Sequence, residues 1–202
     1  MLPNASGVAT LLEAARLLKA SAKPLKRSIL FLACTGEEEG EKGSLYYAEK
    51  PTVDLKTVIA DINLDMYLPL FSLKELRAYG LRESDLAGYL EAAAGENGIR
   101  VQDDPTPERN IFIRSDQYSF IKKGVPSLFL SFGYDSGSGE EKLVNAWFEQ
   151  RYHAPSNDLQ QPVDKQAAAK FNQLMATLSE RIANTPQAPR WKQDSFFRRF
   201  AQ

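Results

Sequence analysis

The spacing of apolar and polar positions predicts a chain in which helices alternate with short strands. Five segments are predicted to be helices: residues 4–22, 43–49, 84–97, 116–123 and 164–183. Five shorter runs have the length and composition of strands: residues 28–35, 58–66, 76–79, 99–101 and 127–132. Such alternation is typical of an α/β fold in which helices cover both faces of a sheet. Residues 133–141 are rich in Gly and Ser and are predicted to form a loop.

One stretch combines a strong strand pattern with a cluster of charge. Its sequence from Ser28 to Gly40 is S-I-L-F-L-A-C-T-G-E-E-E-G, so an apolar run ends in Glu37, Glu38 and Glu39. Like charges that lie side by side repel, so either solvent or a bound cation must favour this cluster. Two interpretations stay open at this point. The cluster is a solvated turn after a buried strand, or it is a metal site at the carboxyl end of a strand, where α/β sheets place ligands.

Two further segments carry residues that suit the same chemistry. In the strand predicted over residues 58–66, Asp61, Asn63 and Asp65 share the face opposite the apolar side chains. The only histidine, His153, lies in R-Y-H-A-P. A lone histidine is more often structural than a ligand, yet one histidine with two carboxylates is a ligand set of hydrolytic zinc sites. Neighbouring carboxylates on an extended segment point apart, so one can bind metal while the other acts as a general base.

Composition excludes some functions and leaves others open. A chain of 202 residues with 25 basic and 26 acidic side chains has a net charge of −1, which argues against a nucleic-acid footprint. The length favours a single domain, and no apolar run is long enough to cross a bilayer. The opening residues show neither the charged nor the apolar region of a signal peptide. The single Cys34 excludes an internal disulfide and is expected to be a buried thiol, so the redox compartment stays undetermined.

Six motifs in sequence order make the chain resemble a known family. The motifs are N-A-S-G-V-A from Asn4, T-G-E-E-E-G-E-K-G-S from Thr35, I-N-L-D-M from Ile62, R-S-D-Q-Y-S-F from Arg114, K-G-V-P-S-L-F from Lys123 and R-Y-H-A-P-S-N-D from Arg151. This order resembles the M28 family of zinc-dependent aminopeptidases and carboxypeptidases, most closely its exported bacterial members. The resemblance implies a three-layer α/β/α sandwich with a central, mostly parallel mixed sheet. Residues 1–185 would form part of the catalytic domain, and residues 186–202 would be a tail that packs on it or trails from it.

The resemblance also implies a role for each candidate site residue. Glu37 would be the general base, and Glu38 and His153 would bind one zinc ion. Asp65 would bind a second zinc ion. Tyr152 would donate a hydrogen bond to the oxyanion of the tetrahedral intermediate, although it could equally be a tyrosine of the core or rim. The implied substrate is a peptide with a free N-terminus, and the implied location is periplasmic or secreted.

The chain departs from the family pattern at several positions. The family's upstream His-x-Asp motif, whose histidine binds the second zinc, has no counterpart, and Pro3 stands where an aspartate would bridge both metals. Gln117 stands where many relatives have histidine, and Asp116 is predicted to be a helix N-cap. We therefore expect one or more N-terminal strands and a helix to be missing, as in a truncated gene model or a fragment. The chain is expected to bind at most one zinc ion, weakly, and to hydrolyse peptides poorly.

Two alternative functions remain. The first is a non-catalytic binding module that keeps the fold without the chemistry; the retention of all four acidic and histidine candidates counts against it. The second is an enzyme similar to glutaminyl cyclases, which share this fold and use one zinc ion with Asp, Glu and His ligands. Their aspartate corresponds to Pro3 here, so this alternative ranks lower.

Overall fold

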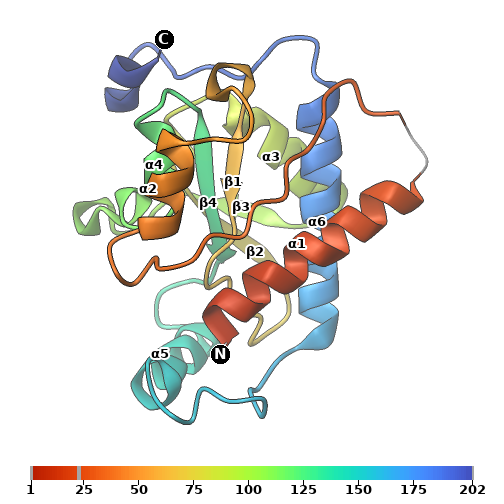
Figure 1. The fold of residues 1–202 in the computed structure, drawn as a ribbon. Coiled ribbons are helices and arrows are strands. Elements are labelled where there is room, and N and C mark those ends of the chain that lie inside the picture. The colour runs from red at the N-terminus through yellow and green to blue at the C-terminus, as the bar shows by residue number, and fades with distance from the viewer. Residues whose placement is uncertain (1, 22–23, 202) are drawn as a thin grey trace.

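A computed structural model describes residues 2–21 and 24–201 of the chain. Its helices are α1 (Leu2–Ala20), α2 (Lys42–Glu49), α3 (Leu86–Glu96), α4 (Gln117–Ile121), α5 (Gly139–Arg151) and α6 (Lys165–Asn184). Its strands are β1 (Asp61–Asn63), β2 (Glu75–Tyr79), β3 (Arg100–Gln102) and β4 (Ser127–Phe132). Figure 1 shows these elements in the order of the chain.

The strands form one mixed sheet with the order β1-β4-β2-β3. β1 runs parallel to β4, and β2 runs parallel to β3, while the central pair of β2 and β4 is antiparallel. The register of that central pair places Arg77 opposite Ser131 and Ala78 opposite Leu130. Because side chains alternate along a strand, this register gives the sheet one apolar face and one mixed face.

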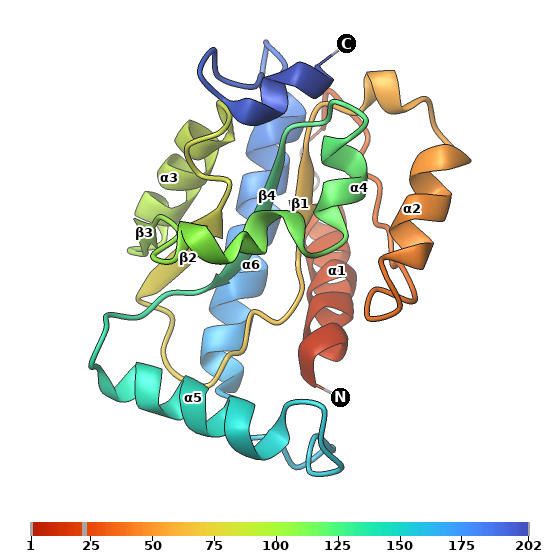
Figure 2. The ribbon, with the colours of Figure 1, turned by 90° about the vertical axis from the view of Figure 1, so that its left-hand side faces the viewer.

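Helices cover both faces of the sheet, which confirms the predicted three-layer fold. α1, α3 and α6 lie on one face, and α2 and α4 lie on the other, while α5 crosses one end of the molecule near the start of α1 (Figures 1 and 2). The main core lies between the sheet and the first group of helices. Its fully buried members come from β2, β4, α3 and α6: Leu76, Ala78, Leu86, Leu90, Ala93, Ala94, Leu128, Leu130, Phe171, Leu174 and Leu178.

The long helix α6 supplies the largest part of this core. Asp164 begins it as predicted, because its carboxylate accepts hydrogen bonds from the backbone N–H groups of Gln166 and Ala167, each at 2.9 Å. The buried ring of Phe171 stacks on Tyr67 with a centroid distance of 4.2 Å. Burial of such a side chain contributes about 1.5–3 kcal/mol, so the apolar stripe rather than helix propensity fixes this element.

The prediction of a buried strand at residues 28–35 is wrong. The segment is extended but is not part of the sheet, and within the described part of the chain the backbone groups of residues 29–34 have no hydrogen-bond partner. Leu30 and Phe31 are 51% and 38% exposed. A strand needs a ladder partner as well as an apolar pattern, and the neighbouring β1 pairs only with β4. β1 is likewise shorter than the predicted strand of residues 58–66.

One helix of the structure, α5, was not predicted from the sequence. α5 occupies residues 139–151, so the Gly- and Ser-rich loop ends at Ser138. The Ser138 hydroxyl accepts a hydrogen bond from the Glu141 backbone N–H at 3.1 Å, and the Glu141 carboxylate accepts one from the Gly137 backbone N–H at 2.7 Å. This arrangement resembles a capping box, whose Ser-x-x-Glu signature was present in the sequence.

The C-terminal segment lies against the sheet face that carries α4. The indole N–H of the buried Trp191 donates to the carbonyl oxygen of Gly124 at 2.9 Å. Backbone bonds join Asp85 to Arg190 and Lys192 to Glu83 at 3.0 and 2.9 Å. Residues 186–201 therefore extend the cover of this face.

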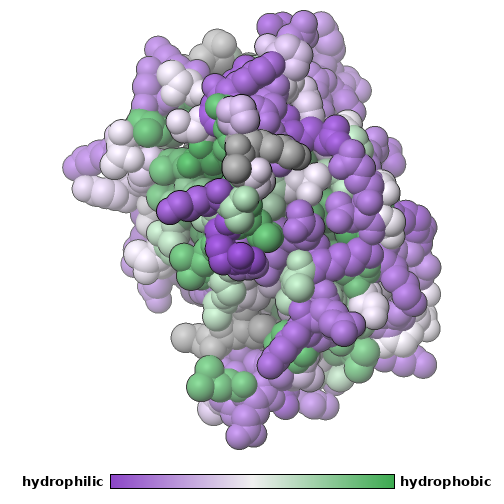
Figure 3. All heavy atoms as spheres, turned by 90° about the vertical axis from the view of Figure 1, so that its right-hand side faces the viewer, coloured by the Kyte–Doolittle hydropathy of each residue, from purple (hydrophilic) through white to green (hydrophobic). Residues whose placement is uncertain are grey.

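The face shown in Figure 3 is mostly polar, with apolar side chains exposed in several separate places. The large apolar residues exposed on α1 include Leu12, which is 70% accessible. None of the helices in residues 2–21 and 24–201 combines the length and the apolar character needed to cross a membrane.

The cap of α6 provides a test of this fold. Asp164→Ala removes the acceptor of two backbone N–H groups, so we expect the free energy of unfolding to fall by about 1 kcal/mol. Urea unfolding followed by circular dichroism measures this change. Asp164→Asn keeps an acceptor at the same position and is the matched control. Equal stability of the Ala variant and the wild type would contradict the cap.

Candidate active site

The loop after the extended segment holds Glu37 and Glu38 in place through backbone hydrogen bonds. The Glu37 carbonyl oxygen accepts from Gly40 and Glu41 at 3.0 and 2.8 Å, and the Thr35 carbonyl oxygen accepts from Gly43 at 2.8 Å. A Cβ atom on Gly43 would lie 2.4 Å from that Thr35 oxygen, so only glycine permits this close approach. The loop thus has a defined backbone conformation and leads directly into α2.

Asp65 lies just beyond the end of β1, in a segment with unusual backbone angles. Met66 and Leu68 have φ angles of 51° and 49°, a left-handed conformation that costs roughly 1–2 kcal/mol for residues with a Cβ. α1 packs closely on the preceding residue, because a Cβ atom on Gly7 would lie 2.0 Å from the Leu64 carbonyl oxygen. Strained residues of this kind persist where the surrounding structure determines them and often mark functional sites.

His153 and Tyr152 reach the same region from the end of α5. The Nε2 atom of His153 lies 2.6 Å from Oε1 of Glu38, so the structure joins two predicted metal ligands that are separated by 115 residues in the chain. His153 also has a positive φ of 52°. Its ring stacks on Tyr152 with a centroid distance of 3.9 Å, and Phe148 packs against the tyrosine ring at 5.2 Å. Both side chains of the His153–Glu38 pair remain about half exposed.

A cavity of about 520 Å³ connects these residues. Glu37, Glu38, Asp65 and Tyr152 all line it, and His153 reaches it through its contact with Glu38. The wall also includes residues of β2, β4 and the loops around them: Arg77, Tyr79, Arg109, Arg114, Phe129, Ser131 and Tyr134. The structure therefore brings the predicted site residues together at a single concave surface.

Burial and mutual repulsion change the acidity of the site. Burial, with added repulsion from Asp65 and Glu38, raises the pKa of Glu37 to about 7. Burial, with repulsion from Asp116 and Glu38, raises the pKa of Asp65 to about 6. The pKa of Tyr152 is raised by burial and then by the nearby carboxylates. Perturbed groups gathered in one cavity are a frequent property of active sites.

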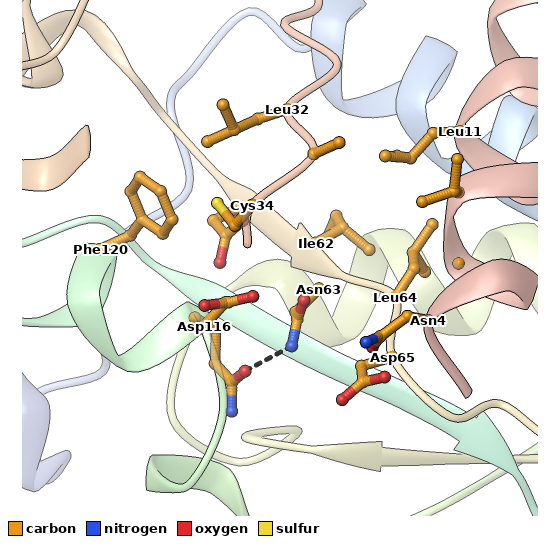
Figure 4. A pocket seen from close by; sticks show the side chains of 15 residues that line it. Asn4, Leu11, Leu32, Cys34, Ile62, Asn63, Leu64, Asp65, Asp116 and Phe120 are labelled. Carbon is orange, nitrogen blue, oxygen red and sulfur yellow. Dashed lines mark hydrogen bonds between the residues drawn. The ribbon is translucent and has the colours of Figure 1, made fainter. Parts of the chain in front are cut away.

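A second, smaller cavity of about 110 Å³ separates the extended segment from β1. Figure 4 shows Cys34, Asn63, Asp65 and Asp116 facing this space, with Leu11 of α1 at its apolar side. One carboxylate oxygen of each of Asp61, Asp65 and Asp116 is buried without a hydrogen-bond partner. Burial, followed by repulsion from Asp116 and Asp61, raises the pKa of the Cys34 thiol to about 11, so the half-buried thiol stays protonated near pH 7.

The structure assigns different roles to the neighbours of this second cavity than the sequence predicted. Asp116 stands at the N-cap position of α4, but its side chain makes no capping hydrogen bond, so that prediction is wrong. Its carboxylate is turned into the cavity instead (Figure 4). Gln117 is completely buried and accepts a hydrogen bond from the Asn63 amide at 2.6 Å. It also donates to the Phe112 carbonyl oxygen at 2.8 Å, and therefore ties β1 to α4.

The three arginines that line the larger cavity, Arg77, Arg109 and Arg114, were not predicted from the sequence to belong to the site. In the strand E-L-R-A-Y, Leu76 and Ala78 point into the main core, so Arg77 lies on the opposite face. The alternation of side chains along this strand could have indicated it. A charged residue between two apolar residues of a strand is expected on the face opposite the apolar core.

Comparisons with known proteins show the family and the fold. Residues 2–179 match the model of peptidase family M28. The chain belongs to this family. Its fold is similar to crystal structures of LapA and of LapA aminopeptidase from Legionella pneumophila. The first has a TM-score of 0.67 and 19% identity over 91% of this chain and 48% of the LapA chain.

The second LapA structure gives a TM-score of 0.66 with 20% identity, over 92% of this chain and 47% of that one. At these identities the similarity defines the fold, and the chain spans about half the length of the LapA chains. No curated protein matched the sequence.

Members of this family typically depend on zinc, so the donor atoms must be compared with what zinc needs. Glu38 and His153 provide a carboxylate oxygen and an imidazole nitrogen in direct contact. Among residues 2–21 and 24–201, however, no three histidine, cysteine or acidic side chains lie close enough together to hold a metal ion. A catalytic zinc usually has three protein ligands. The described residues therefore supply part of a zinc site and do not fit a complete one.

The buried carboxylates predict a specific effect of pH on stability. Burial raises the pKa of Asp61 to about 7, which exceeds its value in an unfolded chain. Between roughly pH 4 and 7 the folded state then keeps a proton that the unfolded state releases, so rising pH favours unfolding. Asp61→Asn stays neutral and removes this contribution. The free energy of unfolding of this variant, measured with urea, should increase relative to that of the wild type by roughly 1.4 kcal/mol for each unit of rising pH over this range.

The exposed carboxylate Asp194 provides the control for this experiment. Asp194→Asn makes the same chemical change at an exposed position and is the matched control. A constant difference between Asp61→Asn and the wild type from pH 4 to 7 would show that Asp61 is ionised in the folded state.

Proposed function

We propose that this chain is the hydrolytic part of an exopeptidase that cleaves the peptide bond next to a free N-terminus. The observation that carries the proposal is the meeting of Glu37, Glu38, Asp65, Tyr152 and His153 at one cavity, although they come from three distant parts of the sequence. Family membership supports the reaction class. The similarity in fold to LapA aminopeptidase supports the choice of the N-terminal end.

Glu37 and Tyr152 have complementary tasks in this proposal. The Glu37 carboxylate accepts a proton from water as the water oxygen attacks the scissile carbonyl carbon. The Tyr152 hydroxyl donates a hydrogen bond to the carbonyl oxygen, which becomes an oxyanion. Glu37 then passes the proton to the leaving nitrogen, and the carbon–nitrogen bond breaks. Both side chains line the cavity in which the peptide would lie.

The charge of the cavity wall supports recognition of a free amino group. Glu38 and Asp65 line the cavity together with Glu37. A substrate ammonium would offset the repulsion between these carboxylates, because each opposite charge lowers the energy of the ionised forms. Resemblance to exported members of the family supports a periplasmic or secreted location.

For zinc, we propose that the chain binds at most one ion, through Glu38 and His153. The 2.6 Å contact between these side chains places both donors at one point. Asp65 belongs to the same cavity but is not grouped with them as a third ligand in the described part of the chain. Two ligands imply weak binding and slow hydrolysis, since a catalytic zinc usually has three.

The incomplete ligand set favours a second candidate function, a non-catalytic module that binds peptides in the same cavity. It retains the cavity and its charges but needs neither metal nor turnover. Hydrolysis distinguishes the two functions, because a binding module releases no product.

A variant of Glu37 tests the hydrolytic proposal. Glu37→Gln keeps the shape of the side chain but cannot accept a proton, so kcat/KM for leucine p-nitroanilide, assayed with added zinc, should fall by about 10²–10⁴-fold. Glu39→Gln changes a neighbouring glutamate that does not line the cavity and should leave the rate unchanged. Hydrolysis by Glu37→Gln at the wild-type rate would exclude this residue as the base. Absence of turnover in the wild type would favour the binding module.

The zinc proposal has its own measurement. Elemental analysis after zinc loading and exhaustive dialysis should give a zinc-to-protein ratio of one or less. His153→Ala should lower the retained zinc further, because it removes one donor of the contacting pair. A ratio near two would mean that other side chains complete a two-metal site.

A further inference from the structure

Arg77 is a buried cation at the wall of the larger cavity. It lies in the middle of β2, opposite Ser131 of the central strand β4, and only 9% of its surface is exposed. Its neighbours Leu76 and Ala78 face the main core, so the guanidinium extends from the other face of the sheet. There it lines the same cavity as Glu37 and Tyr152.

The protein supplies this guanidinium with few partners. One terminal nitrogen donates to the Tyr134 carbonyl oxygen at a long distance of 3.3 Å, and the group lies 4.5 Å from the centroid of the Tyr134 ring. The Nε–H group is buried and has no hydrogen-bond partner. Within the described residues, none of the ion pairs formed by arginine side chains involves Arg77; they belong to Arg16, Arg82, Arg100 and Arg181.

A buried charge without an opposite charge is expensive. Buried cations are normally paired, because desolvation alone costs several kcal/mol per ion. Burial lowers the pKa of Arg77, but the contacts with Tyr134 and Tyr79 more than offset this effect and the pKa is raised overall. The side chain thus stays charged, lines the cavity and holds a buried Nε–H group without a hydrogen-bond partner. These properties suit a group that binds an anionic part of a ligand.

We propose that the cavity binds its peptide ligand through a carboxylate that pairs with the buried guanidinium of Arg77. This inference rests on the proposed function for the identity of the ligand as a peptide. The planar guanidinium suits a carboxylate, since two parallel N–H groups can donate to its two oxygens. Two exposed arginines, Arg109 and Arg114, also line the cavity and add positive potential.

The carboxylate has two possible sources in a peptide. It belongs to an acidic side chain, or it is the C-terminal carboxylate of a short peptide. Three matched dipeptides separate them. Glutamyl-alaninamide has only the acidic side chain, glutaminyl-alanine has only the terminal carboxylate, and glutaminyl-alaninamide has neither.

Isothermal titration calorimetry of the purified chain with the three dipeptides tests the proposal. One of the two acidic probes should bind at least about tenfold more tightly than glutaminyl-alaninamide. In Arg77→Met this preference should disappear, while Arg77→Lys should retain part of it because the charge remains. Equal affinities for all three probes, no detectable binding of any probe, or a preference that survives Arg77→Met would overturn the proposal.

Stability measurements separate a binding role of Arg77 from a structural one. Arg77→Met replaces an unpaired buried charge with an apolar side chain of similar length, so its urea unfolding midpoint should equal or exceed that of the wild type. Arg82→Met removes a charge from an exposed arginine outside the cavity and should alter neither probe preference nor midpoint appreciably. A clear loss of stability in Arg77→Met would indicate a structural role.

The binding experiment does not depend on turnover. Release of free alanine or alaninamide is measured in parallel with the titrations. A carboxylate preference without hydrolysis would support this inference while the proposed hydrolytic function fails. Hydrolysis without a carboxylate preference would leave the proposed function intact and exclude the role of Arg77.

Discussion

The alternation of side chains along β4 is the constraint on which both the core and the cavity depend. β4 is hydrogen-bonded to β1 on one side and to β2 on the other, so it holds the sheet together. Leu128 and Leu130 are fully buried toward α3 and α6. The intervening Phe129 and Ser131 face the cavity. A shift of one residue in register would exchange these two faces, exposing the leucines and burying the serine. Burial of the leucines, about 1.5–3 kcal/mol each, thus also fixes where the cavity lies.

Several residues of the candidate site are held in energetically unfavourable states. Four carboxylates, Glu37, Asp61, Asp65 and Asp116, have raised pKa values, and burial is the first cause for each of them. Met66, Leu68 and His153 adopt left-handed backbone angles close to these groups in the chain or in space. Each feature costs free energy in the isolated protein. Stability must come from elsewhere, and the apolar core around α6 is the part of the molecule that can provide it.

The sequence predicts those elements that depend on residues close together in the chain. It does not predict elements that depend on distant partners. The start of α6 near Asp164 and its apolar stripe depend on neighbouring residues, so the sequence pattern predicted both. Residues 28–35 have an equally clear apolar pattern, but a strand also requires a partner along its edge, and no local pattern reports that. α5 was missed because a Gly- and Ser-rich run obscured the capping signature at Ser138. Asp116 precedes a helix in the sequence, yet its carboxylate faces the smaller cavity and does not cap α4 (Figure 4).

The candidate site also has features that the sequence predicts and features that only the fold reveals. The residue types, and the places of Glu37, Glu38 and Asp65 at the ends of predicted strands, suggested that these three residues and His153 suit metal-dependent hydrolysis. The family motifs then implied a role for each. The contact between Glu38 and His153 needed the fold, because it joins residues 115 positions apart.

The wall of the larger cavity carries charges of both signs, which the net charge of −1 conceals. Glu37, Glu38 and Asp65 contribute carboxylates to it, and Arg77 contributes a buried guanidinium that forms no ion pair within the described residues. A peptide is itself a dipole, with an ammonium at its start. Fixed charges at the wall of a cavity act on such a ligand more strongly than charges in bulk water, because the local dielectric constant is lower. Under the proposed function, the ammonium would be drawn toward Glu37, Glu38 and Asp65. That orientation would bring the first peptide bond toward Glu37 and Tyr152 and would oppose the reverse binding mode that a carboxypeptidase needs.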